Sequence, residues 1–184
     1  MKTPKALRVL LVILAMTFAF ACTNKAKAPD VSSSIRQALD QAGLRDVSVS
    51  QDRDKNVVTL NGNVATDNER TQAESIARSI AGTQVVANEI GVRPAGDEST
   101  AKKVDSDLDK GIDKNVDAAL VQRKLNHDVR FDVKNGVVTL KGTVTSESRR
   151  TAVEKLVAQV PNVKQVVNEL EVKDQKATST ARNQ

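Results

Sequence analysis

The stretch VVTLNGNV at residues 57–64 decides the fold of this chain, because it occurs twice. It returns 80 residues later as VVTLKGTV at residues 137–144. Further identities follow at the same offset: Arg70-Thr71 with Arg150-Thr151, and Asn88-Glu89 with Asn168-Glu169. A fixed offset over so many positions indicates that one structural unit has been duplicated.

Hydrophobic and polar residues alternate within this stretch, which is typical of a strand with one buried face. Val58, Leu60 and Val64 fall on that face. Gly62, and Gly142 in the second copy, lie inside the strand, where glycine weakens pairing. We interpret both glycines as structural, marking a bulge or the close approach of a helix.

Working outward, each copy predicts the order helix, strand, strand, helix, strand. Val31, Ile35 and Leu39 are spaced four apart and predict the first helix. Thr66 and Glu69 predict a capping box at the start of the second. This second helix is expected to bury Ala73, Ile76, Ala77 and Ile80, matched by Val153, Leu156, Val157 and Val160.

The strand connections are also predictable. Asn135-Gly136 favours a two-residue type I′ hairpin turn. A last strand is expected at residues 86–92 and again at 166–172, parallel to an earlier strand because a helix links them. Asn88 and Asn168 lie in step with the buried valines of these strands, so we expect their amides to hydrogen-bond backbone groups and fix a loop.

These patterns predict an α+β protein of two small tandem αββαβ domains, each with two helices on a three-stranded mixed sheet. Val104 and Leu108 could extend the first helix of the second copy backwards by two turns. The expected division is a signal peptide at 1–21, a tether at 22–29, domains at 30–93 and 112–173, a linker at 94–111 and a disordered tail at 174–184.

The first 21 residues follow the plan of a secretory signal peptide. Lys2, Lys5 and Arg8 precede an uncharged run at residues 9–21, which is too short to span a bilayer. Ala19-Phe20-Ala21 is an A-x-A cleavage site. The alternative is an uncleaved anchor.

Cys22, the only cysteine, directly follows this site. The segment Ala19-Phe20-Ala21-Cys22 resembles the lipobox of bacterial lipoproteins, although Ala19 and Phe20 depart from its usual residues. The resemblance implies that Cys22 is acylated and anchors the chain to a membrane. The alternative is ordinary signal-peptide cleavage that leaves a free thiol.

Composition limits the possible partners. The formal charge is +5, but removing the predicted signal peptide leaves 25 basic and 23 acidic residues, or +2. A nearly balanced exported protein is a poor candidate for binding nucleic acid. Phe131 is the only aromatic residue beyond the signal peptide, so the cores must consist of Val, Ile, Leu and Ala, and we expect modest stability.

The repeated unit resembles the BON domain. The resemblance rests on the pattern hydrophobic-Val-Thr-Leu-x-Gly-x-Val, on the amphipathic helix after it, and on the closing Val-x-Asn-x-(Ile/Leu)-x-Val; Gly62 and Gly142 fall on the hallmark glycine of the family. It implies an envelope protein that binds membranes or protein partners and has no catalytic activity. Tandem BON lipoproteins of the outer membrane, facing the periplasm, have the most similar architecture. A soluble periplasmic protein is the alternative.

In one such lipoprotein the first helix of the second domain binds anionic phospholipid with an inserted aromatic side chain. The corresponding helix here, residues 109–125, has no aromatic residue. Its outer flank instead carries four candidate membrane-contact residues: Lys110, Lys114, Val121 and Lys124. The alternative is that this flank is only a solvated face, because Asp113 and Asp117 offset part of its positive charge. The second functional hypothesis for the protein is an adaptor that binds envelope proteins.

The sequence offers little for chemistry. His127 is the only histidine and has no cysteine or second histidine with which to hold a metal, so we expect it at the surface. A phosphate-binding glycine loop and a nucleophile motif are also missing. We therefore expect neither enzymatic activity nor a cofactor, and the oligomeric state stays open.

Overall fold

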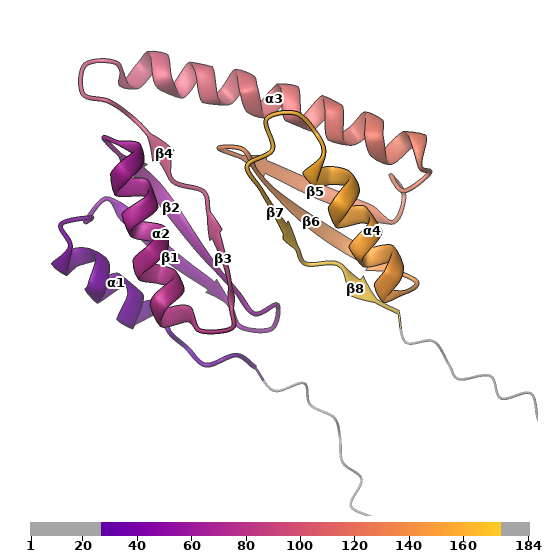
Figure 1. Cartoon of the computed structure of the whole chain (residues 1–184), viewed down its shortest axis with the longest axis horizontal. Coiled ribbons are helices and arrows are strands. Elements are labelled where there is room, and N and C mark those ends of the chain that lie inside the picture. Colours follow the sequence, from indigo (N-terminus) through magenta and orange to yellow (C-terminus); the bar gives the residue numbers. More distant parts are fainter. Residues whose placement is uncertain (1–26, 174–184) are drawn as a thin grey trace, which may run out of the picture.

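A computed structural model describes residues 27–173 and shows two successive αββαβ units, which we call domain 1 and domain 2 (Figure 1). The predicted α+β class and tandem arrangement are thus confirmed. The predicted signal peptide, Cys22 and the predicted disordered tail lie outside the described residues.

The two domains consist of the same elements in the same order. Those of domain 1 are α1 (Ser32–Gln41), β1 (Val47–Asp52), β2 (Val57–Val64), α2 (Asp67–Ala81), β3 (Val85–Asn88) and β4 (Gly91–Val92). Those of domain 2 are α3 (Glu98–Gln122), β5 (Val129–Lys134), β6 (Val137–Val144), α4 (Glu147–Ala158), β7 (Gln165–Asn168) and β8 (Glu171–Val172).

The duplicated stretch forms the central strand of each sheet. β2 pairs antiparallel with β1 and parallel with β3 and β4, and β6 has the same neighbours in domain 2. The single last strand predicted at 86–92 is broken in two. The Ile90 side chain turns into the core, and the Ile90 N–H donates a hydrogen bond to the side-chain oxygen of Asn88. The hydrogen-bond ladder between the strands is therefore interrupted there.

The predicted local signals form as expected. Asn135 and Gly136 both have positive φ, 50° and 85°, which the predicted two-residue turn requires. The Thr66 hydroxyl accepts a hydrogen bond from the Glu69 N–H, and the Glu69 carboxylate accepts one from the Thr66 N–H. This capping box is the predicted start of α2.

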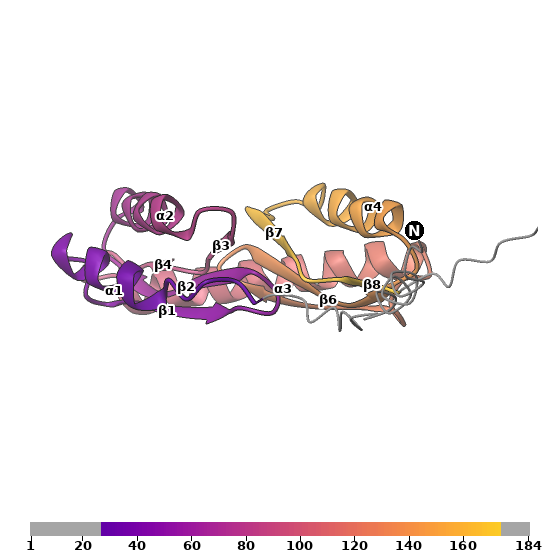
Figure 2. The same cartoon turned by 90° about the horizontal axis from the view of Figure 1, so that it is seen from below.

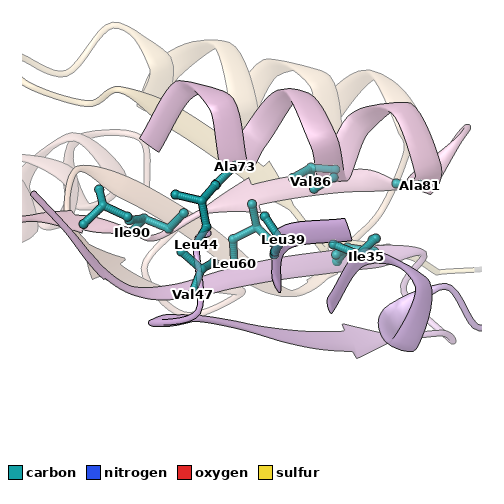
Figure 3. Close-up of a cluster of buried hydrophobic side chains, with 12 residues drawn as sticks. Ile35, Leu39, Leu44, Val47, Leu60, Ala73, Ala81, Val86 and Ile90 are labelled. Atoms are coloured by element: carbon teal, nitrogen blue, oxygen red, sulfur yellow. The ribbon is translucent and has the colours of Figure 1, made fainter. Parts of the chain in front are cut away.

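Each core lies between one face of a sheet and two helices. In domain 1, Ile35 and Leu39 of α1 meet Leu60 of β2 and the small side chains of α2 (Figure 3). The predicted helix face is correct, but Ile76 and Ile80 are only partly buried. The fully buried α2 positions are Ala73, Ala77 and Ala81.

Gly62 and Gly142 are required by backbone crowding. A Cβ at Gly62 would lie 2.1 Å from the carbonyl oxygen of Asp46, and one at Gly142 would lie 2.2 Å from that of Asp128. Both glycines also have positive φ, 119° and 126°. The predicted close approach therefore exists, but it comes from the backbone just before β1 and β5 and not from a helix.

Helix α3 begins earlier than expected. Residues 94–111 were predicted as a linker, but the chain is helical from Glu98, so that much of this segment belongs to a 25-residue helix. After Pro94 the segment has no further proline, and Ala101, Lys102 and Lys103 in its early turns are good helix formers. Arg93, next to β4, forms an ion pair with Asp105, which fixes the early turns of α3 to domain 1.

The two domains pack side by side through the third strand of each. β3 and β7 are neighbours at the centre of the molecule, and α2 and α4 lie on the same side of the joined sheets (Figures 1 and 2). Four small hydrophobic residues, none more than 3% exposed, form a separate cluster at this junction: Val57, Ala87, Val137 and Val167.

Polar contacts complete the junction. The side chain of Gln165 spans it, accepting from the Asn88 N–H at 3.2 Å and donating to the Val86 carbonyl at 2.7 Å. Lys134 of domain 2 lies 3.3 Å from the Glu89 carboxylate of domain 1. One glutamine thus satisfies two backbone groups at the edge of β3.

The crowding around the strand glycines predicts a large stability effect. Gly142→Ala should lower the free energy of unfolding by about 3 kcal/mol, because the new methyl group meets a carbonyl oxygen and the backbone keeps a positive φ. Chemical denaturation followed by circular dichroism measures this change.

Gly111→Ala is the matched control, since Gly111 is an exposed position of α3 with nothing within 4 Å of a new Cβ. Here alanine should raise the free energy of unfolding by up to about 1 kcal/mol. Equal effects of the two substitutions would show that the glycine in β6 is dispensable.

The Gln165 contact predicts a local change in hydrogen exchange. Gln165→Ala should speed exchange of the Asn88 amide roughly tenfold, because the hydrogen bond from this N–H to the Gln165 side chain, worth about 1–2 kcal/mol, is lost. Val85→Ala is the control: Val85 holds the equivalent position in β3 and is 44% exposed. Unchanged protection of the Asn88 amide in Gln165→Ala would refute the role of Gln165.

Candidate functional site

The first described residues are fixed to domain 1, although the sequence predicts a tether at 22–29. We call residues 27–31 the docked segment. The Ala28 N–H donates to the Arg53 carbonyl at 3.0 Å, and Arg53 Nε donates back to the Ala28 carbonyl at 2.7 Å. Lys27 lies 3.2 Å from the Asp54 carboxylate, and the Ala28 side chain is buried.

Two glutamines hold the rest of the docked segment. Gln51 Nε2 donates to the Pro29 carbonyl at 2.8 Å, and Gln51 Oε1 accepts from the Val31 N–H at 3.1 Å. Gln84 is buried, donates to the same Pro29 carbonyl and accepts from Gln51. A satisfied network of this kind orders the segment, so only residues 23–26 separate it from Cys22.

The docked segment and α3 lie at opposite ends of domain 1. Ala28 binds Arg53 in the β1–β2 turn, beside the first residue of β2, whereas Arg93 bonds to Val64, the last residue of β2, and to Asp105 of α3. An eight-residue strand is about 25 Å long. Figure 1 shows α3 along one edge of the molecule and the docked segment entering from the other.

Three of the four candidate contact residues lie on α3, turned away from the buried stripe Ile112, Val116 and Leu120: Lys110, Lys114 and Val121. The fourth, Lys124, was predicted on the same flank but lies in the turn beyond the end of the helix at Gln122, where its φ is 56°. Val121 is 49% exposed, and the other three are exposed as well: Lys110, Lys114 and Lys124. The structure therefore leaves all four accessible.

Acidic residues offset the charge of this flank. Lys110 lies 3.2 Å from the Asp107 carboxylate. Lys110 and Lys114 also border a groove of about 610 Å³ between α3 and the end of β2, where Asp105, Asp109 and Asp113 are among the lining residues. Over its whole length α3 has six acidic residues and four lysines, so its attraction for an anionic surface is weak.

Asn88 and Asn168 form the backbone hydrogen bonds that the sequence predicts. The Asn168 amide donates to the Arg150 carbonyl and to Glu154, both on α4, and its oxygen accepts from the Leu170 N–H. Asn88 makes the equivalent bonds in domain 1. These amides join the second helix of each domain to the bend between its last two strands, which is a structural role.

Charges of both domains meet on the helix-free side of the junction. Burial raises the pKa of Glu169, the nearby Lys141 ammonium lowers it, and Asp52 of domain 1 raises it again. A hydrogen bond to Asp132 raises the pKa of Lys141. The domains are thus electrostatically coupled at a boundary that sequence reasoning left open.

The described residues offer no arrangement for metal chemistry. His127 is exposed, as predicted. Residues 27–173 contain no group of three histidine, cysteine or acidic side chains placed to hold a metal ion. Within this same range, no helix is long and apolar enough to cross a membrane.

Sequence reasoning missed the docked segment and the domain junction. One signal for the junction was present: Val57 and Val137 precede the buried valines by one position and so fall on the face expected to be solvent-exposed. Paired hydrophobic residues at the start of both strands indicate that this face is covered. The docked segment had no comparable signal, because its partners Gln51 and Gln84 are ordinary polar residues.

Solved structures were also compared with this one. Two structures of CdsD, a structural protein of the type III secretion system of Chlamydia trachomatis, align with 76% of this chain at TM-scores of 0.32 and 0.30 and 12–13% identity. The alignments cover 66% and 62% of those chains, slightly less than two thirds. Likeness at this level supports no functional argument.

Sequence comparison is more informative. Over 146 residues the chain is 27% identical to the osmotically inducible protein Y of Escherichia coli, covering 78% of this chain and 71% of that protein. The family model described as "BON domain" matches twice, at residues 28–94 and 101–174. These two matches coincide with the two αββαβ units of the structure, and the chain belongs to the BON family, with two BON domains in tandem.

Proposed function

We propose that this chain is a non-catalytic cell-envelope lipoprotein, acylated at Cys22, that supports envelope integrity or osmotic stress tolerance by binding at phospholipid surfaces. Membership of the BON family and likeness to an osmotically inducible protein support a stress-related role in the envelope. The finer location, on the periplasmic face of the outer membrane, is part of this proposal.

The observation that carries the proposal is the docked segment. Because the chain is fixed to domain 1 from Lys27, an acyl group on Cys22 would hold both domains within a few residues of the bilayer. Contact between a domain and the membrane then becomes intramolecular, with an effective concentration in the millimolar range for a short linker. Even a weak contact between the domain and the membrane then forms for much of the time.

Beyond the contact that the anchor brings about, the outer flank of α3 is the proposed site of contact with a second phospholipid surface. Each lysine near an anionic bilayer contributes about 1 kcal/mol, and Val121 adds exposed apolar surface beside the lysines. The acidic residues of α3 reduce this sum, and they favour the second candidate, an adaptor that binds an envelope protein along the α3 groove.

Acylation predicts a specific mass for the mature N-terminus. Mass spectrometry of the membrane fraction should find an N-terminal peptide that begins at Cys22 and carries acyl chains. Cys22→Ser should move the protein to the soluble periplasmic fraction. An unmodified Cys22 in a soluble mature protein would contradict the anchor and leave a soluble BON protein.

Vesicle binding separates the two candidate functions. A soluble version starting after Cys22 should co-sediment with anionic vesicles at low salt, and Lys110/Lys114/Lys124→Glu should weaken this binding at least tenfold. Arg36/Arg45/Lys155→Glu is the control, with the same change of charge at exposed sites outside α3. No vesicle binding, together with a defined protein crosslinked in the intact envelope, would favour the adaptor.

A further inference from the structure

We propose that the end of domain 1 formed by the docked segment and the β1–β2 turn faces the anchoring membrane, and that the outer flank of α3 faces away from it. This inference rests on the proposed acylation of Cys22. It assigns a membrane-facing surface to residues that lie far from the candidate contact residues of α3.

The first step is the length of chain between the anchor and the folded domain. Acyl chains on Cys22 would place that residue at the bilayer surface. Six residue steps lead from Cys22 to the buried Ala28, and fully extended chain covers about 3.3–3.6 Å per residue. Ala28 therefore lies no more than about 20 Å from the bilayer surface.

The second step is the position of α3. Ala28 is bonded beside the start of β2, and α3 is attached, through Arg93, at the other end of that strand. Seven strand steps separate Val57 from Val64, about 23 Å, and the thickness of α3 adds about 10 Å. With the docked end towards the membrane, the outer flank of α3 is beyond the reach of the short linker.

The third step is the direction in which the chain leaves domain 1. Lys27, the first described residue, pairs with Asp54 in the β1–β2 turn. The residue that follows the linker is therefore held at the outer tip of this end of domain 1. In Figure 1 the docked segment points away from α3. To bring α3 to the same bilayer, the linker would have to reverse and run back along domain 1.

Charge favours the same orientation. At the docked end the three basic residues Lys27, Arg53 and Lys55 are matched by Asp30, Asp52 and Asp54, whereas the acidic residues of α3 outnumber its lysines by two. An anionic bilayer therefore disfavours α3 more than the docked end. In the anchored protein, the outer flank of α3 is therefore available to contact a second surface in the periplasm.

Fluorescence quenching in the full acylated protein tests this orientation. Because acylation blocks the thiol of the only cysteine, a new cysteine can be labelled alone. Thr83→Cys labels the docked end and Asn115→Cys labels α3; both positions are exposed. In phosphatidylethanolamine–phosphatidylglycerol vesicles with a headgroup quencher, the label at position 83 should be quenched at least twofold more efficiently. Equal quenching, or stronger quenching at position 115, would overturn the proposal.

A longer linker provides the control. A flexible Gly–Ser stretch of about 20 residues inserted after residue 26 should remove most of the twofold difference, and a difference that persists would show that the linker does not set the orientation. Mass spectrometry of Cys22 tests the anchor separately. If the mature protein carries no acyl chain on Cys22, the acylation proposal fails, whereas acylated protein with α3 at the bilayer refutes the orientation alone.

Discussion

The packing of Val57, Ala87, Val137 and Val167 between the two sheets is the contact on which the rest of this structure depends. Each BON domain has a small core of aliphatic side chains and alanine, in which Phe131 is the only aromatic residue. Domains of this size bury a small fraction of their surface and are only marginally stable. Joining β3 to β7 gives both sheets a second buried face at their centre and covers one edge of each. It also converts two weak units into one body, in which a single attachment point determines where every other surface lies.

Duplication alone would have produced two equivalent halves, but the junction is asymmetric. Gln165 bonds to the edge of β3, while the equivalent position in domain 1 is Val85, which cannot do so. Lys134 pairs with Glu89 across one side of the junction, whereas the equivalent residues on the other side, Asp52 and Glu169, are both acidic. These differences disfavour the pairing of two copies of domain 1, since the acidic Asp52 and Glu89 would then oppose one another. Sequence divergence between the copies therefore carries information about assembly.

How well the sequence predicts each feature of this structure depends on how far apart in the sequence the interacting residues lie. Local signals succeeded: the Asn135-Gly136 turn, the capping box at Thr66 and the alternation in β2 each depend on residues a few positions apart. The reason for Gly62 was only partly predicted, because the carbonyl that crowds it belongs to Asp46 on another segment. The docked segment was missed entirely, because Gln51 and Gln84 acquire their role only when folding brings them to Pro29. For the candidate site, the exposure of Lys110, Lys114 and Val121 followed from helical spacing, whereas the end of α3 before Lys124 and the distance of all four from the chain's point of attachment required the structure.

This geometry changes what the candidate contact on α3 means. Taken alone, an exposed flank with lysines suggests a helix that lies on the membrane to which the protein is anchored. The docked segment and the flank, however, lie at opposite ends of β2, and the linker from Cys22 is shorter than the distance between them. α3 itself carries a net negative charge, and its groove is lined by both acidic and basic side chains. A helix that is held away from one bilayer and is weakly attracted to anionic lipid is better placed to meet a protein or a second surface across the periplasm. The anchor and the binding face would then perform separate tasks, with the rigid junction between the domains connecting them.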